Sequence, residues 1–389
     1  MNRITRFNPH LMPDDLILAL NTGREKEQRF VQEIIDRNVE GGRPPQHILL
    51  YGPRGIGKSF FLRLLQIHLA KQQQLCFVLL PEEQRNVYQP ADLIREIKNH
   101  LAEERRDAGI GAWGSSDVAA WRTQVAELEG VWETQGKPHL VVGWENVDLL
   151  FSKGGAFEKR EDQFLLREFL TETPWLTLIA TTLYPDLDTR YEDALFHFFA
   201  KHELRSWREP QHEAYLRKRN EQAGKKTTRL SLAQLKSLTR FTGGSPRITV
   251  IMVDVLADSN VDSAAETLEK TIDELTPFYQ DLLSRIPPKS RMLFDALIRG
   301  GEPCSQSELA ARVGATQNVI SQSFAWLKNH SYLRVERPEG EKQKLYSVRD
   351  RLFAHYYRMR HILLGSGKSI LSVMGEFLTH FFTHAQLRE

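Results

Sequence analysis

The segment HILLYGPRGIGKSFFLRLLQIHL, residues 47–69, decides how the middle of this chain folds. Residues 47–51 form a short apolar run that predicts a buried strand. Residues 52–59 read GPRGIGKS and match GxxxxGK[ST], the pattern of a phosphate-binding loop. From Lys58 onward the apolar spacing predicts a helix. At background composition, about one chain of this length in a hundred contains such a match by chance. The strand before the loop and the helix after it reduce that chance further.

The chemistry of this loop follows from its residue types. Glycines let the backbone curl until successive N–H groups point inward at phosphate oxygens, and the start of the helix adds a partial positive charge. Lys58 is expected to reach the β- and γ-phosphates, and Ser59 to ligate Mg²⁺. ATP and Mg²⁺ are therefore the expected cofactors. The residues expected to contact the nucleotide here are Gly52, Pro53, Arg54, Gly55, Ile56, Gly57, Lys58, Ser59 and Phe60.

Strands and helices alternate along the first half of the chain. Apolar runs at residues 76–81, 139–144 and 176–182 predict strands, and the periodic apolar positions of 91–101 predict a helix. Thr22 to Glu25 fits a capping box that would begin an earlier helix. Strands that alternate with helices indicate a parallel sheet covered on both faces. The predicted fold class is therefore α/β, an αβα sandwich around the phosphate loop.

A second part of the nucleotide site is expected where the strand 139–144 ends and the sequence continues as ENVD. An acid there would hold Mg²⁺, and the next side chain would orient the attacking water. We favour a register with Glu145 on the metal side and Asn146 in the position of the catalytic acid. The alternative register puts Trp144 on the metal side and makes Glu145 the base. An asparagine orients water but cannot take its proton, so the first register predicts slow hydrolysis and a nucleotide that acts as a switch.

Two further polar features fit a nucleotide site. Thr181 and Thr182 end the strand 176–182, where Thr182 could sense the γ-phosphate, although paired threonines are also common in strands. Residues 243–247 read GGSPR, in which serine caps a helix, proline occupies its first turn and Arg247 follows at the helix start. Arg247 is a candidate to close onto the γ-phosphate; the alternative is a surface arginine after a turn.

After residue 207 the pattern changes to helices, and a last unit follows near residue 286. This unit is predicted to contain three helices and then two strands, the arrangement of a winged helix. Ser305 and Glu308 form a capping box at the start of its second helix. The expected organisation is an N-terminal segment 1–45, a phosphate-loop core 46–206, a helical lid 207–280, a winged helix 281–360 and a C-terminal packing helix 361–389.

The winged unit carries the candidates for DNA contact. Its third helix, near residues 317–328, buries one stripe and leaves short polar side chains on the opposite stripe, where they could meet base edges in a major groove. Residues 281–360 hold 14 Lys and Arg against 8 Asp and Glu, whereas the whole chain has a net charge of only +2. Duplex DNA is therefore the expected partner, with an effector protein as the alternative because winged helices also bind proteins. The DNA-contact candidates are Asn318, Ser321 and Gln322 in the helix and Arg337, Lys342 and Lys344 in the wing.

Together these motifs resemble the AAA+ superfamily, and within it the prokaryotic archaeal-type ATPases, which are related to origin-recognition initiators and STAND NTPases. The resemblance covers most of the chain. FNP near Phe7 and NTGRE at 21–25 look like the adenine-side box of that group, which implies that Arg24 lies beside the nucleotide. The same resemblance implies that ENVD is a modified Walker B motif, IATT sensor 1 and GGSPR sensor 2. Arg190 and Arg205 are candidates for an arginine finger, on which assembly into a homo-oligomer would depend.

Composition excludes several other classes of protein. The 389 residues are 41% hydrophobic and 26% charged, which argues against disorder, collagen-like repeats and coiled coils. Cys76 and Cys304 are far apart and lack metal-site spacing, so neither a disulfide nor a zinc site is expected. The N-terminal residues lack the apolar segment of a signal peptide, and no apolar stretch reaches the length of a membrane span. We therefore expect a cytoplasmic protein with no membrane partner.

Overall fold

The computed structural model describes most of the chain, in ranges separated by short gaps. The described residues are 8–81, 87–102, 118–152, 154–185, 194–222, 224, 230–258, 261–337, 343–363 and 375, without the side chains of 254–265, 267 and 363. The chain forms two compact units, each described here by itself. The first comprises Met1–Gly52 and Gly57–Arg205, and the second comprises Pro53–Ile56 and Ser206–Glu389.

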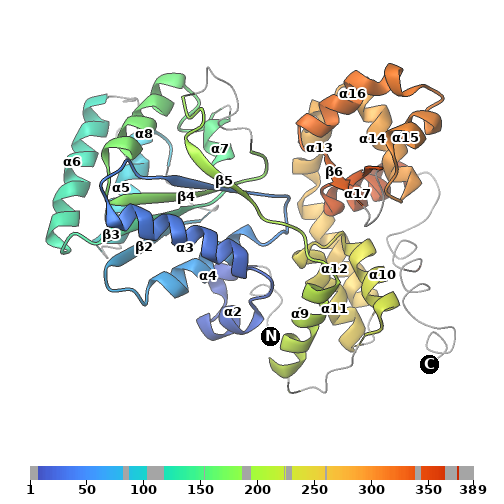
Figure 1. The fold of residues 1–389 in the computed structure, drawn as a ribbon, viewed down its shortest axis with the longest axis horizontal. Helices are drawn as coiled ribbons and strands as arrows, with labels where there is room; N and C mark the ends of the chain where they lie inside the picture. Colours follow the sequence, from blue (N-terminus) through green and yellow to red (C-terminus); the bar gives the residue numbers. More distant parts are fainter. Residues whose placement is uncertain are drawn as a thin grey trace. The chain divides into compact units, whose positions relative to one another are not determined.

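The first unit is built on a five-stranded sheet with the strand order β2-β3-β4-β1-β5, and every neighbouring pair is parallel (Figure 1). The strands are β1 (His47–Tyr51), β2 (Leu75–Leu80), β3 (His139–Trp144), β4 (Leu176–Thr182) and β5 (Phe199–Glu203). In this register Leu50 lies opposite Thr181, and Tyr51 lies opposite Thr182. The carboxyl ends of β1 and β4 therefore meet at one edge of the sheet.

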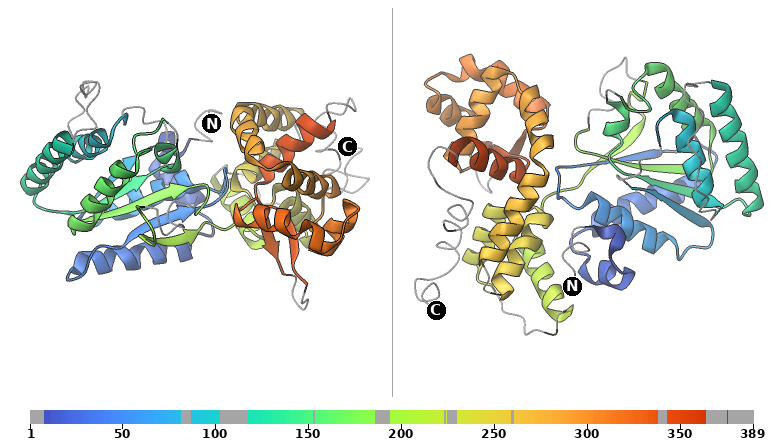
Figure 2. Two further views of the ribbon diagram at one scale, coloured as in Figure 1. Left: turned by 90° about the horizontal axis from the view of Figure 1, so that it is seen from above. Right: turned by 180° about the vertical axis from the view of Figure 1, so that it is seen from behind.

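Helices cover both faces of this sheet, so the αβα sandwich predicted from the sequence is confirmed (Figure 2). One face carries α3 and α4, and the other carries α5, α6 and α8. Their bounds are α3 (Glu25–Glu40), α4 (Lys58–Leu69), α5 (Pro90–Leu101), α6 (Val118–Thr134) and α8 (Arg160–Glu172); the shorter elements are η1 (Pro9–Leu11), α2 (Asp14–Leu20) and α7 (Asp148–Phe151).

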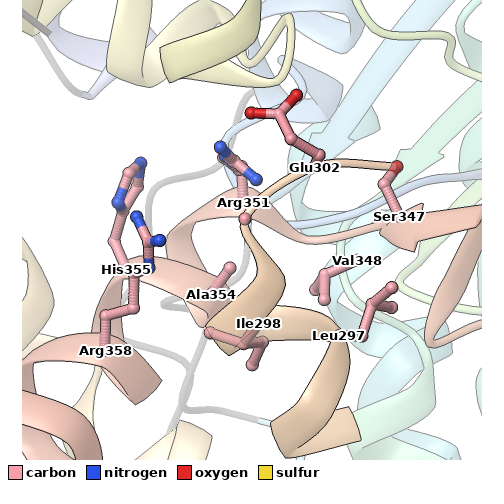
Figure 3. Close-up of a pocket in the computed structure, with 10 residues that line it drawn as sticks. Leu297, Ile298, Glu302, Ser347, Val348, Arg351, Ala354, His355 and Arg358 are labelled. Carbon is pink, nitrogen blue, oxygen red and sulfur yellow. The ribbon is translucent and has the colours of Figure 1, made fainter. Parts of the chain in front are cut away.

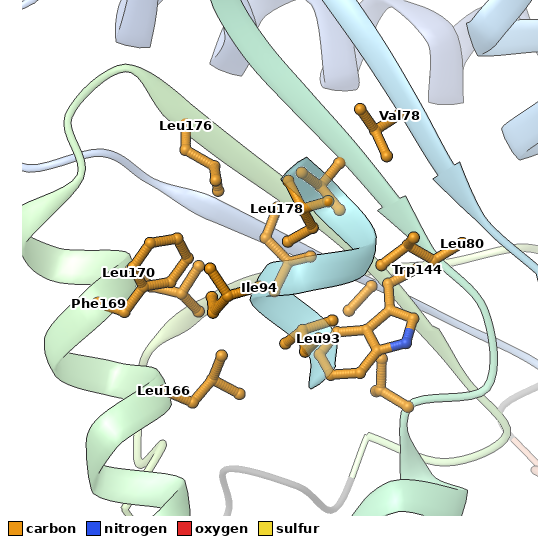
Figure 4. Close-up of a cluster of buried hydrophobic side chains, with 14 of the residues drawn as sticks. Val78, Leu80, Leu93, Ile94, Trp144, Leu166, Phe169, Leu170, Leu176 and Leu178 are labelled. Atoms are coloured by element: carbon orange, nitrogen blue, oxygen red, sulfur yellow. The ribbon is translucent and has the colours of Figure 1, made fainter. Parts of the chain in front are cut away.

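The core between the sheet and the second of these layers is apolar and rich in aromatic rings. Ile94, Trp144 and Phe169, from three different elements, contribute to it (Figure 4). Trp121 meets both Phe157 and Phe169 edge to face, at centroid distances of 6.5 and 5.8 Å. Because both sides of the sheet are covered, β3 and β4 are buried along their whole length, and this explains their unbroken apolar runs.

Two sequence expectations in this unit were wrong. Strand β5 was not predicted: it reads FAKHE, and its residues are only partly buried because it lies at the edge of the sheet. The predicted capping box at residues 22–25 does not form. Helix α3 begins at Glu25 with Arg24 at the N-cap and no side-chain cap, while the hydroxyl of Thr22 donates to the Leu20 carbonyl at 3.0 Å.

The second unit contains helices followed by a small two-stranded antiparallel sheet of the winged-helix type, as predicted. Its capping box at Ser305 is confirmed: the Ser305 hydroxyl accepts from the Glu308 N–H at 3.2 Å, and the Glu308 carboxylate accepts from the Ser305 N–H at 2.7 Å. The elements are α9 (Glu209–Gln222), α10 (Leu232–Thr242), α11 (Pro246–Asp258), α12 (Val261–Glu274), α13 (Thr276–Arg285), α14 (Pro288–Gly300), α15 (Gln306–Arg312), α16 (Gln317–Asn329), β6 (Leu333–Glu336), β7 (Leu345–Val348), α17 (Arg351–Tyr357) and η3 (Arg358–Leu363).

Nearly all of the expected C-terminal helix, 361–389, lies outside the described residues. Within the described part of the chain, no helix combines the length and the apolar character needed to cross a membrane.

Candidate functional site

The phosphate loop joins the end of β1 to the start of α4. Gly57 has a φ of 95° and serves as the N-cap of α4, a helix that starts at Lys58 and also carries Ser59 and Phe60 in its first turn. The Lys58 side chain is buried, and its Nζ donates to the Gly52 carbonyl at 2.7 Å. The lysine thus lies across its own loop, where a phosphate oxygen could replace that carbonyl as its partner.

The middle of the loop, Pro53–Ile56, belongs to the second unit, where it contacts the GGSPR segment. The Gly55 carbonyl accepts from the Arg247 backbone N–H at 3.1 Å and from the Ser245 hydroxyl at 3.4 Å. Gly55 has a φ of 78°, and a Cβ added there would lie 2.9 Å from Arg247 Cβ. Only glycine fits this position, for its backbone conformation and for the close approach. The start of α11 is therefore bonded directly to the phosphate loop.

A cation–π contact adds to this arrangement within the second unit. The Arg54 guanidinium lies over the ring of Phe278 in α13, 4.1 Å from its centroid. Two of the loop residues that were predicted to contact nucleotide, Arg54 and Gly55, are thus held by residues far along the sequence.

At the end of β3, the structure separates the two registers considered for ENVD. Trp144 faces the core and meets Phe157 at a centroid distance of 6.0 Å and an interplanar angle of 73°, so its indole cannot reach a cation. Glu145 follows immediately; it is 5% exposed, and its backbone N–H donates to Leu80. The geometry therefore favours Glu145 as the carboxylate of this strand end, and its metal role stays a prediction.

A turn after Glu145 links β3 to β4. Asn146 has a φ of 45°, a left-handed conformation that asparagine tolerates better than most residues, and its N–H donates to the Thr181 hydroxyl at 3.1 Å. The Val147 N–H donates to the Thr181 carbonyl at 2.9 Å, and the Gly52 N–H donates to the Thr182 carbonyl at 3.3 Å. Thr181 therefore shapes the turn, and the backbone of Thr182 holds the entrance of the phosphate loop.

His10 is a site residue that the sequence did not indicate. Its Nε2 lies 3.4 Å from the Glu145 carboxylate, because the short η1 turn packs against the phosphate-loop helix α4. Asn8 caps that turn by accepting from the His10 N–H at 3.1 Å. The Asn8-Pro9 pair at the start of the turn was the available signal, but no spacing rule connects residue 10 with residue 145.

Arg24 is almost fully buried in the first unit, close to the phosphate loop. Its Nη1 lies 3.3 Å from the Glu27 carboxylate and donates to the Arg205 carbonyl at 3.0 Å. Burial lowers its pKa, an effect that Glu27 opposes. A Cβ added at Gly57 would lie 4.0 Å from Arg24 Nη2, so the side chain reaches the loop, and its place beside a nucleotide stays a prediction. Arg205 is exposed, and the other finger candidate, Arg190, lies outside the described residues.

These parts fit the phosphates of a nucleotide. The loop offers two glycines with positive φ, a lysine at the helix start and the N-terminal N–H groups of a 12-residue helix, and a carboxylate lies at the end of β3. The described residues contain no cluster of three or more His, Cys, Asp or Glu that could hold a metal by itself. A magnesium ion at Ser59 and Glu145 would therefore need phosphate oxygens among its ligands.

The family description "AAA ATPase domain" matches residues 22–302. The chain belongs to the AAA ATPases. Two solved structures share the fold of this AAA ATPase. The Walker-type ATPase paby2304 of Pyrococcus abyssi is 18% identical, with a TM-score of 0.58 over 87% of this chain and 96% of that one. The Aeropyrum pernix ORC1 protein, solved in complex with DNA, is 16% identical, with a TM-score of 0.50 over 90% and 94%. No curated protein matches the sequence.

The DNA-contact candidates of this AAA ATPase lie on the winged unit and, where described, are exposed. Asn318, Ser321 and Gln322 occupy one side of α16, opposite the buried Ile320, Phe324 and Leu327. Arg337 and Lys344 flank the tip of the wing and are also exposed, whereas Lys342 lies outside the described residues. Cys76 and Cys304 are free thiols.

Proposed function

We propose that this AAA ATPase is an ATP-binding switch with slow hydrolysis, which controls the binding of duplex DNA by its winged unit. The observation that carries this proposal is the position of the GGSPR segment. Within one compact unit, Arg247 and Ser245 contact the phosphate loop at Gly55, while Gly243 contacts the winged unit. A five-residue segment thus touches both the part that binds phosphate and the part that would bind DNA.

The contacts of Gly243 define the second half of this connection. Its carbonyl accepts from Arg334 Nη1 in β6 at 3.1 Å. A Cβ added to it would lie 2.9 Å from Arg351 Cβ in α17, so the two backbones approach closely. When phosphate oxygens take hydrogen bonds from the loop, the Gly55 carbonyl must reorient with the loop, and its bonds to Ser245 and Arg247 change. A shift of the GGSPR segment would then move the wing.

Each residue of the nucleotide site has a role in this proposal. The ammonium of Lys58 pairs with the β- and γ-phosphates, Ser59 and Glu145 hold Mg²⁺, and Arg247 and Thr182 respond to the γ-phosphate. Bound magnesium would neutralise charge on the phosphates. Asn146 orients water, but its amide cannot accept a proton, so hydrolysis is slow.

The proposed DNA contact is supported by charge and by side-chain chemistry. The short polar side chains on the exposed side of α16 match the hydrogen-bonding groups at base edges, and the arginine and lysine of the wing suit phosphates. The excess of positive charge in 281–360 supplies the electrostatic attraction. The Aeropyrum pernix protein with this fold was solved with DNA, which is consistent with the same use here.

The test measures duplex-DNA affinity and native mass together, with and without ATP and Mg²⁺. We expect tighter binding with ATP, a steep loss of affinity as salt rises, and no ATP effect in Lys58→Ala. Lys71→Ala is the matched control, because Lys71 is an exposed lysine just beyond the other end of α4. The native mass reports whether ATP assembles a homo-oligomer, for which Arg205 is the described finger candidate. Absence of DNA binding at low salt with ATP present would refute the proposal.

A second candidate function is an ATP sensor whose winged unit binds an effector protein. One observation favours it: the exposed side of α16 carries Val319, 73% exposed, and Lys328 is the only cationic residue of that helix. An exposed apolar side chain on a helix with a single cation suits a protein surface. Nucleotide binding without DNA binding, together with capture of a partner that Val319→Asp abolishes, would select this function over the first.

A further inference from the structure

A small cavity lies in the second unit, bounded by α14, the loop after it, β7, α17 and the start of η3 (Figure 3). Its apolar lining comes from Leu297, Ile298, Val348 and Ala354. Its polar lining comes from Arg351, His355 and Arg358 along one helical segment and from Glu302 and Ser347. None of the roles proposed above uses this cavity.

Among the described residues, two arginines at this cavity have no ion pair with a carboxylate. Arg351, His355 and Arg358 follow one another at helical spacings of four and three residues, and Figure 3 shows their side chains extending in the same direction. Arg358 has no hydrogen bond or ion pair with any described residue. Arg351 donates to the Phe241 carbonyl at 3.4 Å and has no ion pair within the part of the chain that the structure describes. The carboxylate at the rim, Glu302, is already paired with Arg240.

The pKa of Arg351 reflects both its burial and the charges around it. Burial, together with the positive charges of Arg358 and Arg240, lowers its pKa to about 10, against a smaller opposing effect of Glu336. The described residues therefore hold these guanidinium groups close together and compensate their charge only in part. An anion in the cavity would supply that compensation.

His355 adds a requirement that a simple anion does not meet. It is 3% exposed, and its Nε2 bonds the Phe241 carbonyl at 3.1 Å. A carbonyl can only accept, so Nε2 carries the proton. Burial lowers the pKa of His355 to about 3, so the ring is neutral and Nδ1 is a bare acceptor. Nδ1 is buried and has no hydrogen-bond partner among the described residues. A group that fills this site should therefore offer a donor as well as negative charge.

We propose that this cavity binds a protonated phosphate group, either inorganic phosphate or the head of a phosphomonoester. The charged oxygens would accept from Arg351 and Arg358, and the P–OH would donate to His355 Nδ1. Sulfate and phosphodiesters carry no such proton near neutral pH, so the site would distinguish a phosphomonoester from the backbone of DNA.

The test is calorimetric titration of the full chain carrying Lys58→Ala, because the phosphate loop would otherwise bind the same ligands. The titrants are inorganic phosphate, methyl phosphate, sulfate and dimethyl phosphate, at constant ionic strength and about pH 6.5, where phosphomonoesters are partly protonated. We expect the first two to bind and the last two to bind roughly tenfold more weakly or worse, since one hydrogen bond to a charged group accounts for that factor. Equal binding of sulfate, or no heat from phosphate at millimolar concentration, overturns the proposal.

Variants locate the site. Arg358→Leu should weaken phosphate binding by about tenfold or more. Arg285→Gln is the control, since it removes an arginine of the same unit that is exposed and paired with Asp281 outside the cavity. Without phosphate, Arg358→Leu should melt at the same or a higher temperature than the parent, because it relieves repulsion with Arg351. Phosphate affinity that is unchanged in Arg358→Leu, or lowered equally by Arg285→Gln, assigns the binding elsewhere and contradicts the proposal.

Discussion

Replacement of Gly55 by alanine tests the bond between the phosphate loop and the start of α11. Gly55 has a φ of 78°, and the new Cβ would lie 2.9 Å from Arg247 Cβ and 3.2 Å from the Ser245 hydroxyl oxygen. The left-handed backbone costs about 1 kcal/mol for alanine. Relief of the close contact, by displacement of the α11 start, adds about 1–3 kcal/mol. We expect the free energy of unfolding to fall by about 2–4 kcal/mol in total.

Gly314→Ala is the matched control for this experiment. Gly314 lies in the same unit with a φ of 68°, and a Cβ there meets nothing within 4 Å. It should therefore cost only the backbone share, about 1 kcal/mol. Urea unfolding without nucleotide compares the two variants, and ATP-dependent DNA binding then reports on the connection. If Gly55→Ala is no less stable than Gly314→Ala, the loop and the α11 start are not packed as described, and the proposed route from nucleotide to wing is refuted.

Three further predictions concern hydrolysis, helix capping and pH. Asn146→Glu should raise steady-state phosphate release, whereas Asn146→Gln, with an equally long side chain and no proton acceptor, should not; equal rates would remove Asn146 from the explanation. Ser305→Ala should lower the free energy of unfolding by about 1 kcal/mol, because α15 loses its N-cap. Ser307→Ala, two residues further along and inside the helix, should lower it by much less. Stability should rise with pH between about 4 and the ordinary histidine pKa of 6.5, because burial lowers the pKa of His47 to about 4 and the unfolded chain binds more protons in that window. His139, His212 and His355 contribute to the same slope, because burial lowers their pKa values to about 4, 4 and 3. His47→Gln should therefore reduce this slope in urea titrations at several pH values, and an unchanged slope would remove His47 from the explanation.

Several features of this protein could be predicted from local sequence alone. The phosphate loop is recognisable because the strand before it and the helix after it are consecutive with it in the chain. The apolar run, the glycines and the lysine therefore appear at fixed spacings in one short segment. The buried strands β3 and β4 were recognisable because both their faces are covered, which demands an unbroken apolar run. The Ser305 capping box was recognisable because its two hydrogen bonds join residues three apart.

The local sequence pattern did not predict strand β5 or the position at which helix α3 begins. Strand β5 reads FAKHE, with only its first two residues apolar, because an edge strand buries few of its side chains. Thr22 and Glu25 have the residue types of a capping box, but the buried Arg24 between them is held by Glu27 and by the Arg205 carbonyl, and the helix starts after it. Arg24 thus bonds a carbonyl far along the chain, and the local capping box does not form.

The sequence by itself determined the nucleotide-binding loop and the winged unit, because each is built from residues close together in the chain. The tertiary structure alone decided that Gly55 meets Arg247, that His10 reaches Glu145 and that Arg351, His355 and Arg358 border a cavity. Hydrogen bonds between residues more than a hundred positions apart leave no periodic trace in a single sequence. They depend on the packing of whole helices and strands, and that packing is set by the summed burial of many side chains rather than by any one motif.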